Sequence, residues 1–382
     1  MNIVFLCGSL EPGRDGVGDY TRRLAGELLR QGHQAAIIAL HDVVEDGQEK
    51  SIGTQQDGEQ AIPVLCLSSR LSWANRARQS GAFIKAINPD WISLQYVPFS
   101  FHEKGLFIGL SNLLKQLSRN SSLHIMFHEL WVGMSIQSPR RQIWLGKAQR
   151  YLIYSLLATL RPLVVHTHTH LYQIYLAKLG VQAFLLPLFS NIPQKSRLNN
   201  NFIPATPTKE HQLKFVIFGG ITPGTPVESI AEEVALYTNQ RKLAVNLTIL
   251  GRSGSQQETW AIAWRTCNLA VHILGEQSPV NIADLLSQSS IGLSTTPMIL
   301  AGKSSAIAAM QAHGLPILCI SQPWQPRGIS EWQSVPGTFQ YTPGNFESFI
   351  AGLSNMKVPC ITLPSITQQF VNNLLVGSIK GM

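Results

Sequence analysis

The sequence of 382 residues predicts an α/β protein made of two doubly wound, Rossmann-like domains facing a cleft. Short apolar runs that end near a glycine alternate with segments of helical periodicity. This alternation starts again after a polar, Asn- and Pro-rich stretch in the middle of the chain. With apolar residues at 45% and charged residues at 14%, a largely disordered chain is excluded.

The first half, residues 1–190, contains the first series of strands and helices. Residues 2–7 form an apolar run that ends at Gly8, which is typical of a buried parallel strand. Apolar residues then recur at helical spacing from Val17 to Leu28, and Gly32 ends this helix. We expect further strands over residues 34–40, 91–94, 123–127 and 163–167, and a helix over residues 139–160.

The second half repeats the pattern after a predicted linker at residues 191–212. Residues 213–363 form the second predicted domain, with strands over 213–218, 245–250, 270–274, 291–294 and 316–320. Its first helix has a strong start signal, because Thr225 is a good cap, Pro226 suits the first helical position and Glu228 follows three residues after the cap.

The charge distribution favours a negatively charged partner. Net charge is +8, and the stretch from Lys104 to Arg161 holds eight basic residues and one acid, Glu129. Phosphorylated ligands and anionic membranes suit such a patch. We expect no nucleic-acid binding, because zinc-finger spacing, RNP-type aromatic motifs and basic arms are absent from the sequence.

A basic helix is predicted at residues 139–160. Basic and aromatic side chains are interleaved in it, which suits peripheral contact with an anionic membrane and a lipid-linked acceptor. An ordinary packed helix is the alternative. The residues concerned are Arg140, Arg141, Trp144, Leu145, Lys147, Arg150 and Tyr151.

The expected location is the cytoplasm. The N-terminal segment has no basic region before its short apolar run, so it reads as a first strand rather than a signal peptide. No apolar stretch is long enough to span a bilayer. The five cysteines are far apart and lack zinc or thioredoxin spacing, so we expect reduced thiols.

Two loops of the first half are candidate ligand sites. Gly16 and Gly18 would let the backbone approach a ligand and would offer N–H groups at a helix N-terminus, although a plain turn is the alternative. His128 follows a predicted strand, where it can donate to a hydroxyl or phosphate or act as an acid or base. A structural histidine is the alternative, and Glu129 would orient the ring or contact a sugar.

Three alternate histidines, His166, His168 and His170, would share one face if they lay on a strand. Such a face suggests a metal site. However, alternate side chains on a strand lie nearly 7 Å apart. We therefore favour a strand end with solvated histidines, and we expect no metal and no cofactor.

Two loops of the second half are candidate phosphate sites. Gly219, Gly220 and Thr222 lie in a glycine-rich loop before a helix, where a phosphate would meet backbone N–H groups; a capped turn is the rival. Lys303 and Ser304 at a helix start suit a diphosphate clamp, with a simple helix cap as the alternative. A P-loop is excluded, because position 297 is proline.

Several segments together resemble family 4 of the nucleotide-sugar glycosyltransferases with the GT-B fold. The resemblance extends over nearly the whole chain. It is carried by residues 16–21 (GVGDYT), 88–96 (NPDWISLQY), 127–129 (FHE), 185–187 (LLP), 250–251 (LG), 291–294 (IGLS) and 310–316, which end in HGLP.

The resemblance implies that a C-terminal helix, at about residues 364–382, crosses back to the first domain. It also implies a nucleotide-sugar donor held by the second domain, an acceptor held by the first, retention of anomeric configuration and no metal. The sequence departs from the family pattern in the donor site. The usual Arg and Lys are missing from residues 219–226, and the usual pair of Glu falls on Ala301 and Ala309.

The expected function is transfer of a sugar to a glycan, a lipid-linked acceptor or a small molecule. His128 and Glu129 are the expected catalytic residues. Lys303 and Arg252 are expected to replace the missing diphosphate ligands, and Glu276 to meet the ribose or base. The alternatives are a non-catalytic nucleotide-sugar or glycan binding protein of the same fold and a sugar-nucleotide epimerase.

Overall fold

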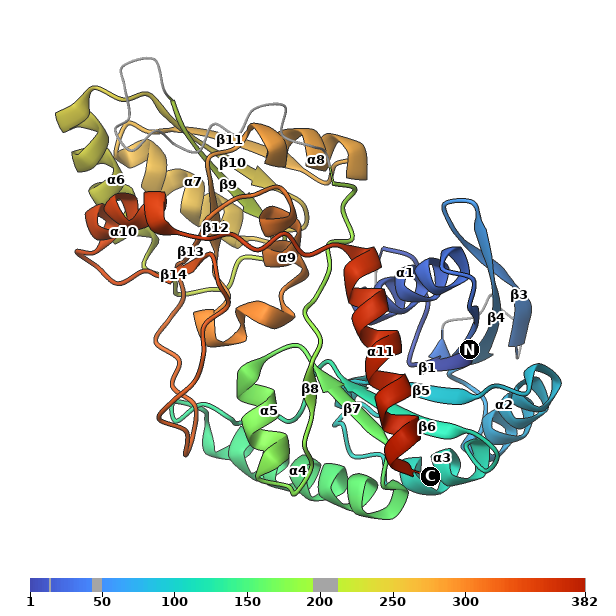
Figure 1. The fold of residues 1–382 in the computed structure, drawn as a ribbon. Coiled ribbons are helices and arrows are strands. Elements are labelled where there is room, and N and C mark those ends of the chain that lie inside the picture. The colour runs from blue at the N-terminus through green and yellow to red at the C-terminus, as the bar shows by residue number, and fades with distance from the viewer. Residues whose placement is uncertain (14, 43–49, 195–211, 382) are drawn as a thin grey trace. The chain divides into compact units, whose positions relative to one another are not determined.

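The computed structural model describes residues 1–13, 15–42, 50–194 and 212–381, and the chain divides into two compact units (Figure 1). Unit 1 comprises residues 1–187, 326–329 and 363–382, and unit 2 comprises residues 188–325 and 330–362. Each unit contains a doubly wound sheet, so the predicted fold class of two Rossmann-like domains is confirmed. Most of the predicted linker, residues 195–211, lies outside the described residues.

The sheet of unit 1 has the strand order β3-β4-β2-β1-β5-β6-β7-β8. All neighbours are parallel except β3 and β4, which are antiparallel. The five predicted strands are present, with ends within two residues of those expected. The strands are β1 (Asn2–Cys7), β2 (Gln34–Asp42), β3 (Lys50–Asp57), β4 (Gln60–Ser68), β5 (Trp91–Tyr96), β6 (Ser122–Phe127), β7 (Val164–Thr167) and β8 (Phe184–Leu185).

The β3–β4 hairpin was not predicted. Strand β3 lies at the edge of the sheet and is mostly exposed and rich in glutamine, so it lacks the apolar run that marks a buried strand. The turn did indicate a hairpin, because Gly58 and Glu59 form a two-residue connection between Asp57 and Gln60.

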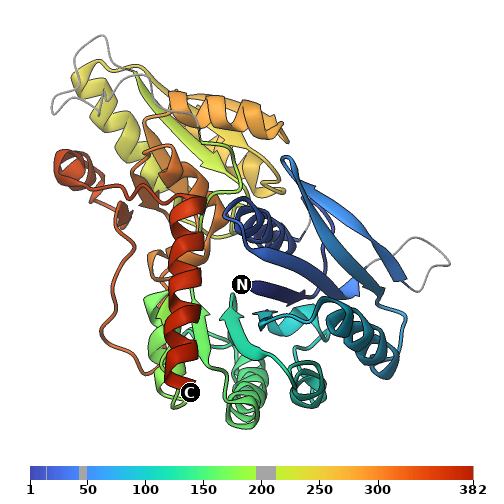
Figure 2. The same cartoon turned by 45° about the vertical axis from the view of Figure 1, so that its right-hand side comes forward.

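Helices cover both faces of this sheet. Helix α1 (Gly16–Arg30) contacts α11 (Leu363–Gly381), and Phe370 of α11 stacks on Phe5 of β1. Helices α2 (Trp73–Ile87), α3 (Leu110–Leu117) and α4 (Arg140–Leu160) form a second row on the other face (Figure 2). The 3-10 turn η1 (Pro98–Ser100) follows β5, and α5 (His170–Ala177) packs beside β7 and β8.

The sheet of unit 2 is entirely parallel, with the order β11-β10-β9-β12-β13-β14. Along β9, Phe215 and Ile217 face one apolar cluster and Val216 faces the other, as the period of a strand requires. The five predicted strands are present. The strands are β9 (Leu213–Phe218), β10 (Val245–Leu250), β11 (Ala270–Gly275), β12 (Ile291–Ser294), β13 (Ile317–Cys319) and β14 (Thr338–Gln340).

The helices of unit 2 lie on both faces of its sheet. They are α6 (Val227–Arg241), α7 (Gln256–Thr266), α8 (Pro279–Gln288), η2 (Met298–Lys303), α9 (Ser305–Ala312), α10 (Phe346–Gly352) and η3 (Leu353–Asn355). The predicted start of α6 was wrong by one residue. Pro226 is its N-cap, with φ −77° and ψ 62°, and Val227 N donates to Thr225 O at 2.8 Å. This inverse γ-turn keeps Thr225 outside the capping position.

Of the helices that the structure describes, none combines the length and apolar character needed to cross a membrane. The five cysteines are free thiols.

Candidate functional site

A cavity of about 310 Å³ lies at the carboxyl ends of β9 and β12 in unit 2. The chain order reverses between these two strands, since β10 and β11 continue on one side of β9 and β12 pairs on the other. Ligands of doubly wound sheets bind at such a switch point. The lining residues are Ile217, Phe218, Gly219, Gly220, Leu293, Ser294, Thr295, Thr296, Lys303, Ser304, Ser305 and Ala306.

Four of the residues predicted from sequence line this cavity together: Gly219, Gly220, Lys303 and Ser304. Lys303 carries the one charged side chain among the lining residues and ends η2. Gly219 has φ +87°, which glycine adopts without strain, and it turns the chain directly after β9. The arrangement joins a cation, hydroxyl groups and the N-terminus of α9, which are the groups that bind phosphate.

Ser304 also has a structural task at this cavity. Its Oγ accepts the backbone N–H of Ile307 at 3.3 Å, so Ser304 is the N-cap of α9. The helix-cap interpretation of Ser304 therefore holds, and the same residue forms part of the cavity wall.

Thr222 supports the wall of this cavity from outside it. Its backbone N–H donates to Thr295 Oγ1 at 2.9 Å, and the two hydroxyl oxygens lie 3.2 Å apart. Thr295 lines the cavity, whereas Thr222 is exposed and does not. The contact fixes the loop after β9 to the loop after β12.

Arg252 and Glu276, predicted to bind different parts of the donor, bind each other. They follow β10 and β11, and Arg252 Nε lies 3.0 Å from Glu276 Oε1. Both side chains are exposed, and neither lines the cavity. The hydrogen bond that Arg252 donates to Glu276 raises the pKa of the guanidinium, which therefore stays charged.

In unit 1 the N-terminus of α1 is capped by the protein itself. Asp15 Oδ1 accepts the N–H of Gly18 at 2.7 Å, which was the N–H group expected to face a ligand. Burial raises the pKa of the Asp15 carboxyl. A Cβ on Gly18 would lie 2.5 Å from Ser9 O, whereas one on Gly16 would meet nothing within 4 Å. Close backbone packing therefore explains the glycine at position 18.

His128 lies at the carboxyl end of β6 and is buried, and Glu129 beside it is half-buried. His128 Nε2 is 2.9 Å from Gln95 Oε1, and Nδ1 is 3.0 Å from His168 Nε2. Burial and the neighbouring His168 ring lower the pKa of His128 well below its ordinary value. A substrate hydroxyl can reach a ring nitrogen only by replacing one of these partners.

His166, His168 and His170 do not share one strand face, and the expectation of solvated histidines at a strand end was wrong for His166 and His168. Strand β7 ends at Thr167, and Thr169 then caps α5 by accepting the N–H of Tyr172 at 3.1 Å. His166 and His168 are buried, not solvated. Within the described ranges, no group of three His, Cys, Asp or Glu side chains is arranged to hold a metal ion.

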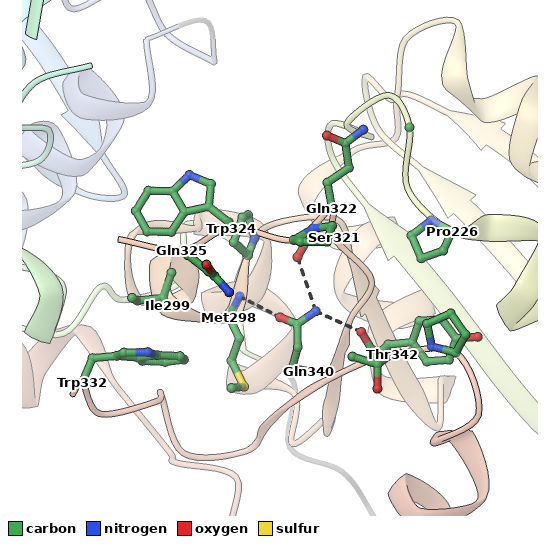
Figure 3. Close-up of a pocket in the computed structure, with 15 residues that line it drawn as sticks. Pro226, Met298, Ile299, Ser321, Gln322, Trp324, Gln325, Trp332, Gln340 and Thr342 are labelled. Atoms are coloured by element: carbon green, nitrogen blue, oxygen red, sulfur yellow. Dashed lines mark hydrogen bonds between the residues drawn. The ribbon is translucent and has the colours of Figure 1, made fainter. Parts of the chain in front are cut away.

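A second cavity in unit 2, of about 490 Å³, was missed by the sequence analysis (Figure 3). Trp324 and Trp332 line it, and no charged side chain does. Gln340 lies in its wall, where its Oε1 accepts Met298 N–H at 3.4 Å and its Nε2 donates to Cys319 O at 3.0 Å. The Trp- and Pro-rich segment at residues 322–326 (QPWQP) was the available signal.

The two cavities of unit 2 meet along the chain. Thr296 lines the smaller cavity, and the next residue, Pro297, lines the larger one. The smaller cavity is polar with one cation, and the larger is aromatic and uncharged. The two cavities therefore differ in chemical character.

Solved structures of similar architecture exist, although no known family profile and no curated protein matches the sequence. Sucrose-phosphate synthase from Thermosynechococcus elongatus superposes with a TM-score of 0.59 at 13% identity, covering 100% of this chain and 98% of that one. The chain has the GT-B fold.

Two further solved structures match nearly the whole chain. HepE from Anabaena, solved in complex with UDP and glucose, gives a TM-score of 0.56 at 14% identity, covering 100% of both chains. UDP-GlcNAc 2-epimerase from Neisseria meningitidis, bound to UDP-GlcNAc, gives 0.52 at 10% identity, covering 98% of this chain and 100% of that one. At such identities the likeness establishes the fold.

Proposed function

We propose that this protein is a glycosyltransferase that moves a sugar from a nucleotide-diphosphate donor to an acceptor. The observation that carries the proposal is the cavity at the switch point between β9 and β12, which holds Lys303, the Gly219-Gly220 turn and the start of α9. The GT-B fold supports it, since HepE of that fold is solved with UDP and glucose.

The smaller cavity would bind the donor diphosphate. A phosphate needs a cation or N–H donors, and Lys303 with the N-terminus of α9 supplies both. The leaving diphosphate would be stabilised by the same groups, which is electrostatic catalysis without a metal ion. Ala301 and Ala309, where the resembled family has two Glu, are buried in the apolar cluster of this unit. The donor site is therefore proposed to differ from that of the family.

The larger cavity would bind the sugar. A neutral sugar ring has no charge to pair, and Trp324 and Trp332 offer flat apolar faces with a polar edge. Its lining is uncharged, in contrast to the cavity with Lys303. We propose retention of configuration, with the acceptor attacking from the face that the diphosphate leaves.

The remaining predicted residues lie outside both cavities of unit 2. His128 and Glu129 are proposed to meet the transferred sugar or the acceptor, with His128 exchanging its bond to Gln95 for a hydroxyl. Gly16 would approach the ligand through its backbone. The pair of Arg252 and Glu276 would have to open to contact the diphosphate and the ribose.

The test is calorimetric titration of nucleoside diphosphates and their sugar conjugates into the wild-type chain, Lys303→Ala and Lys357→Ala. Lys357 is an exposed lysine of unit 2 outside both cavities and is the matched control. We expect binding by the wild type and by Lys357→Ala, and at least tenfold weaker binding by Lys303→Ala. Equal affinity in all three chains would remove Lys303 from the site.

Product analysis separates the three possible functions. With donor and no acceptor, a transferase releases nucleoside diphosphate slowly by hydrolysis, and a glycan or lipid acceptor speeds this release. An epimerase, which the likeness to UDP-GlcNAc 2-epimerase favours as second candidate, instead yields an altered sugar. Tight donor binding without any turnover would support a non-catalytic nucleotide-sugar binding protein. No binding across the panel would contradict both enzymes and leave the non-catalytic glycan binding protein.

We propose in addition that α4 lies on an anionic membrane that carries the acceptor. Its exposed face carries Trp144 and Tyr151, which are 68% and 69% exposed, and Lys147 Nζ lies 4.3 Å from the Trp144 ring centroid. The helix has no acidic residue. Exposed aromatic and basic side chains on one helix face suit the interface of an anionic bilayer.

Vesicle co-sedimentation tests this contact. We expect the wild type to pellet with vesicles containing phosphatidylserine at low salt, and less at high salt because screening weakens the attraction. Trp144→Ala with Lys147→Ala should reduce pelleting, whereas Leu236→Ala should not, because Leu236 is an exposed apolar residue of unit 2. Absence of pelleting by the wild type at low salt would exclude the membrane contact.

A further inference from the structure

A continuous chain of hydrogen bonds runs through the interior of unit 1. It joins seven side chains from β5, β6, β7, α11 and the segments that follow β6 and β7, and it ends on one backbone carbonyl. The serine, the glutamine and the four histidines of this series are buried. Consecutive hydrogen-bond partners lie 2.8–3.0 Å apart. In order, the members are Asn373, His166, His124, Ser93, Gln95, His128, His168 and the carbonyl of Leu186.

The carbonyl end fixes the proton positions of the first ring. Leu186 O can only accept, so His168 Nδ1, at 2.8 Å, must carry a proton. In a neutral ring Nε2 of His168 then holds a lone pair. Its partner at 3.0 Å, His128 Nδ1, must therefore be the donor.

The orientation of the Gln95 amide decides whether Nε2 of His128 carries a proton. The structure places Gln95 Oε1 toward His128 and Nε2 toward Ser93, but the oxygen and nitrogen of a carboxamide can exchange positions, so the hydrogen bonds decide its orientation. With Gln95 Oε1 toward His128, the two rings of His128 and His168 must share three protons and one positive charge. With Gln95 Nε2 toward His128, both rings are neutral. Burial disfavours the charge, as the lowered pKa of His128 indicates, so the neutral arrangement is preferred.

The neutral arrangement also satisfies the rest of the chain. Gln95 Oε1 then accepts from the Ser93 hydroxyl, whose oxygen accepts from His124 Nδ1 at 2.8 Å. His124 Nε2 accepts from His166 Nδ1 at 2.9 Å. Asn373 Nδ2 donates to His166 Nε2 at 2.8 Å, as its amide is already oriented. Each of the seven bonds then has one donor and one acceptor.

We infer that all hydrogen bonds of this series run in one donor-to-acceptor direction, from the Asn373 amide to the Leu186 carbonyl. We infer further that they hold His128 as a neutral ring with its proton on Nδ1 and a lone pair on Nε2. His168 and Gln95 are the positioning residues: Nε2 of His168 accepts the hydrogen bond from His128 Nδ1–H, and the Gln95 amide donates to His128 Nε2 until another donor replaces it. In this state Nε2 of His128 can accept a proton but cannot donate one.

The consequence for catalysis rests on the proposed function. An acceptor hydroxyl that displaces the Gln95 amide would donate its proton to His128 Nε2, so His128 would act as a base. A role as hydrogen-bond donor to the sugar would require a charged ring. The polarity of the chain thus selects one of the two roles that the sequence left open for His128.

Nuclear magnetic resonance of the full chain labelled with ¹⁵N-histidine tests the proton positions without any substrate. We expect His124, His128, His166 and His168 all to show a protonated Nδ1 and an unprotonated Nε2 at neutral pH. Gln95→Glu should add a proton to His128 Nε2, because a carboxylate can only accept. His168→Phe should disturb the Nδ1 signal of His128, and His168→Gln, whose amide can still accept, should restore it. His272→Gln, an exposed histidine of unit 2, is the control.

A protonated Nε2 on His128 in the wild type would overturn the inference, and so would an unchanged His128 pattern in Gln95→Glu. Gln95→Glu keeps the test valid if His168→Phe does not fold. Failure of donor binding with the expected nitrogen pattern would count against the glycosyltransferase alone. The opposite pattern with intact donor binding would count against the chain polarity alone.

Discussion

Glu233 on α6 caps the N-terminus of α10 by accepting the backbone N–H of Phe346 at 3.0 Å. The N-cap residue Asn345 makes no side-chain hydrogen bond to its own helix. The same carboxylate accepts the N–H of Gly344 at 2.7 Å and the hydroxyl of Tyr341. One side chain of the first helix of unit 2 thus holds the segment between β14 and α10.

Glu233→Gln should destabilise the protein by about 1–3 kcal/mol, because the amide places a donor against groups that themselves donate. Chemical denaturation of the whole protein, followed by tryptophan fluorescence, measures the change in the free energy of unfolding. Glu232→Gln is the control, since Glu232 is the exposed neighbour on the same helix. Equal effects of the two substitutions would contradict the capping role.

Gly18→Ala should destabilise unit 1 by about 1–3 kcal/mol, since the new methyl group would meet Ser9 O at 2.5 Å and force the backbone apart. Gly16→Ala should be neutral or stabilise by up to about 1 kcal/mol, because its methyl group has open space at a helical position. Thermal and urea unfolding of both variants compares them. A tolerated alanine at position 18 would show that the loop can move away.

Asp15→Ala should cost about 1 kcal/mol, which is the usual effect of removing a helix N-cap. The reason is the lost bond to the N–H of Gly18 at 2.7 Å. Glu258→Ala is the comparison, because Glu258 lies in the first turn of α7 and is exposed. Urea unfolding that finds the two substitutions equal would show that the cap adds nothing beyond first-turn charge.

Unit 1 should lose stability on acidification. Burial lowers the pKa values of His124 and His128 well below the ordinary range, and that of His166 to about 3. Between about pH 6.5 and these values the unfolded chain binds more protons than the folded one, so stability falls as the pH falls. Each ring adds a slope of up to about 1.4 kcal/mol per pH unit.

Urea unfolding between pH 7 and pH 4 measures this slope. His124→Asn should reduce it, because one buried base is removed, while His272→Asn should leave it unchanged, because His272 is exposed. Slopes that do not differ among the three chains would show that the buried histidines are not the source of the acid lability.

Much of the fold followed from local sequence patterns. The strands β1 and β9 appear as nearly continuous apolar runs, because a strand of a parallel sheet is covered by helices on both faces. The edge strand β3 did not, since an exposed strand carries no such run. The exact start of α6 was missed because Pro226 forms a turn that propensity alone does not reveal.

The sequence by itself determined the alternation of strands and helices, and it placed Gly219 and Lys303 on loops that meet in one cavity. Parallel strands bring their carboxyl ends to one edge, so such loops converge whatever else the chain does. Only the tertiary structure decided that His128 meets His168, 40 residues away, and that Gln95 lies on its other side. Those contacts depend on the order of β5, β6 and β7 in the sheet, and local periodicity does not indicate this order.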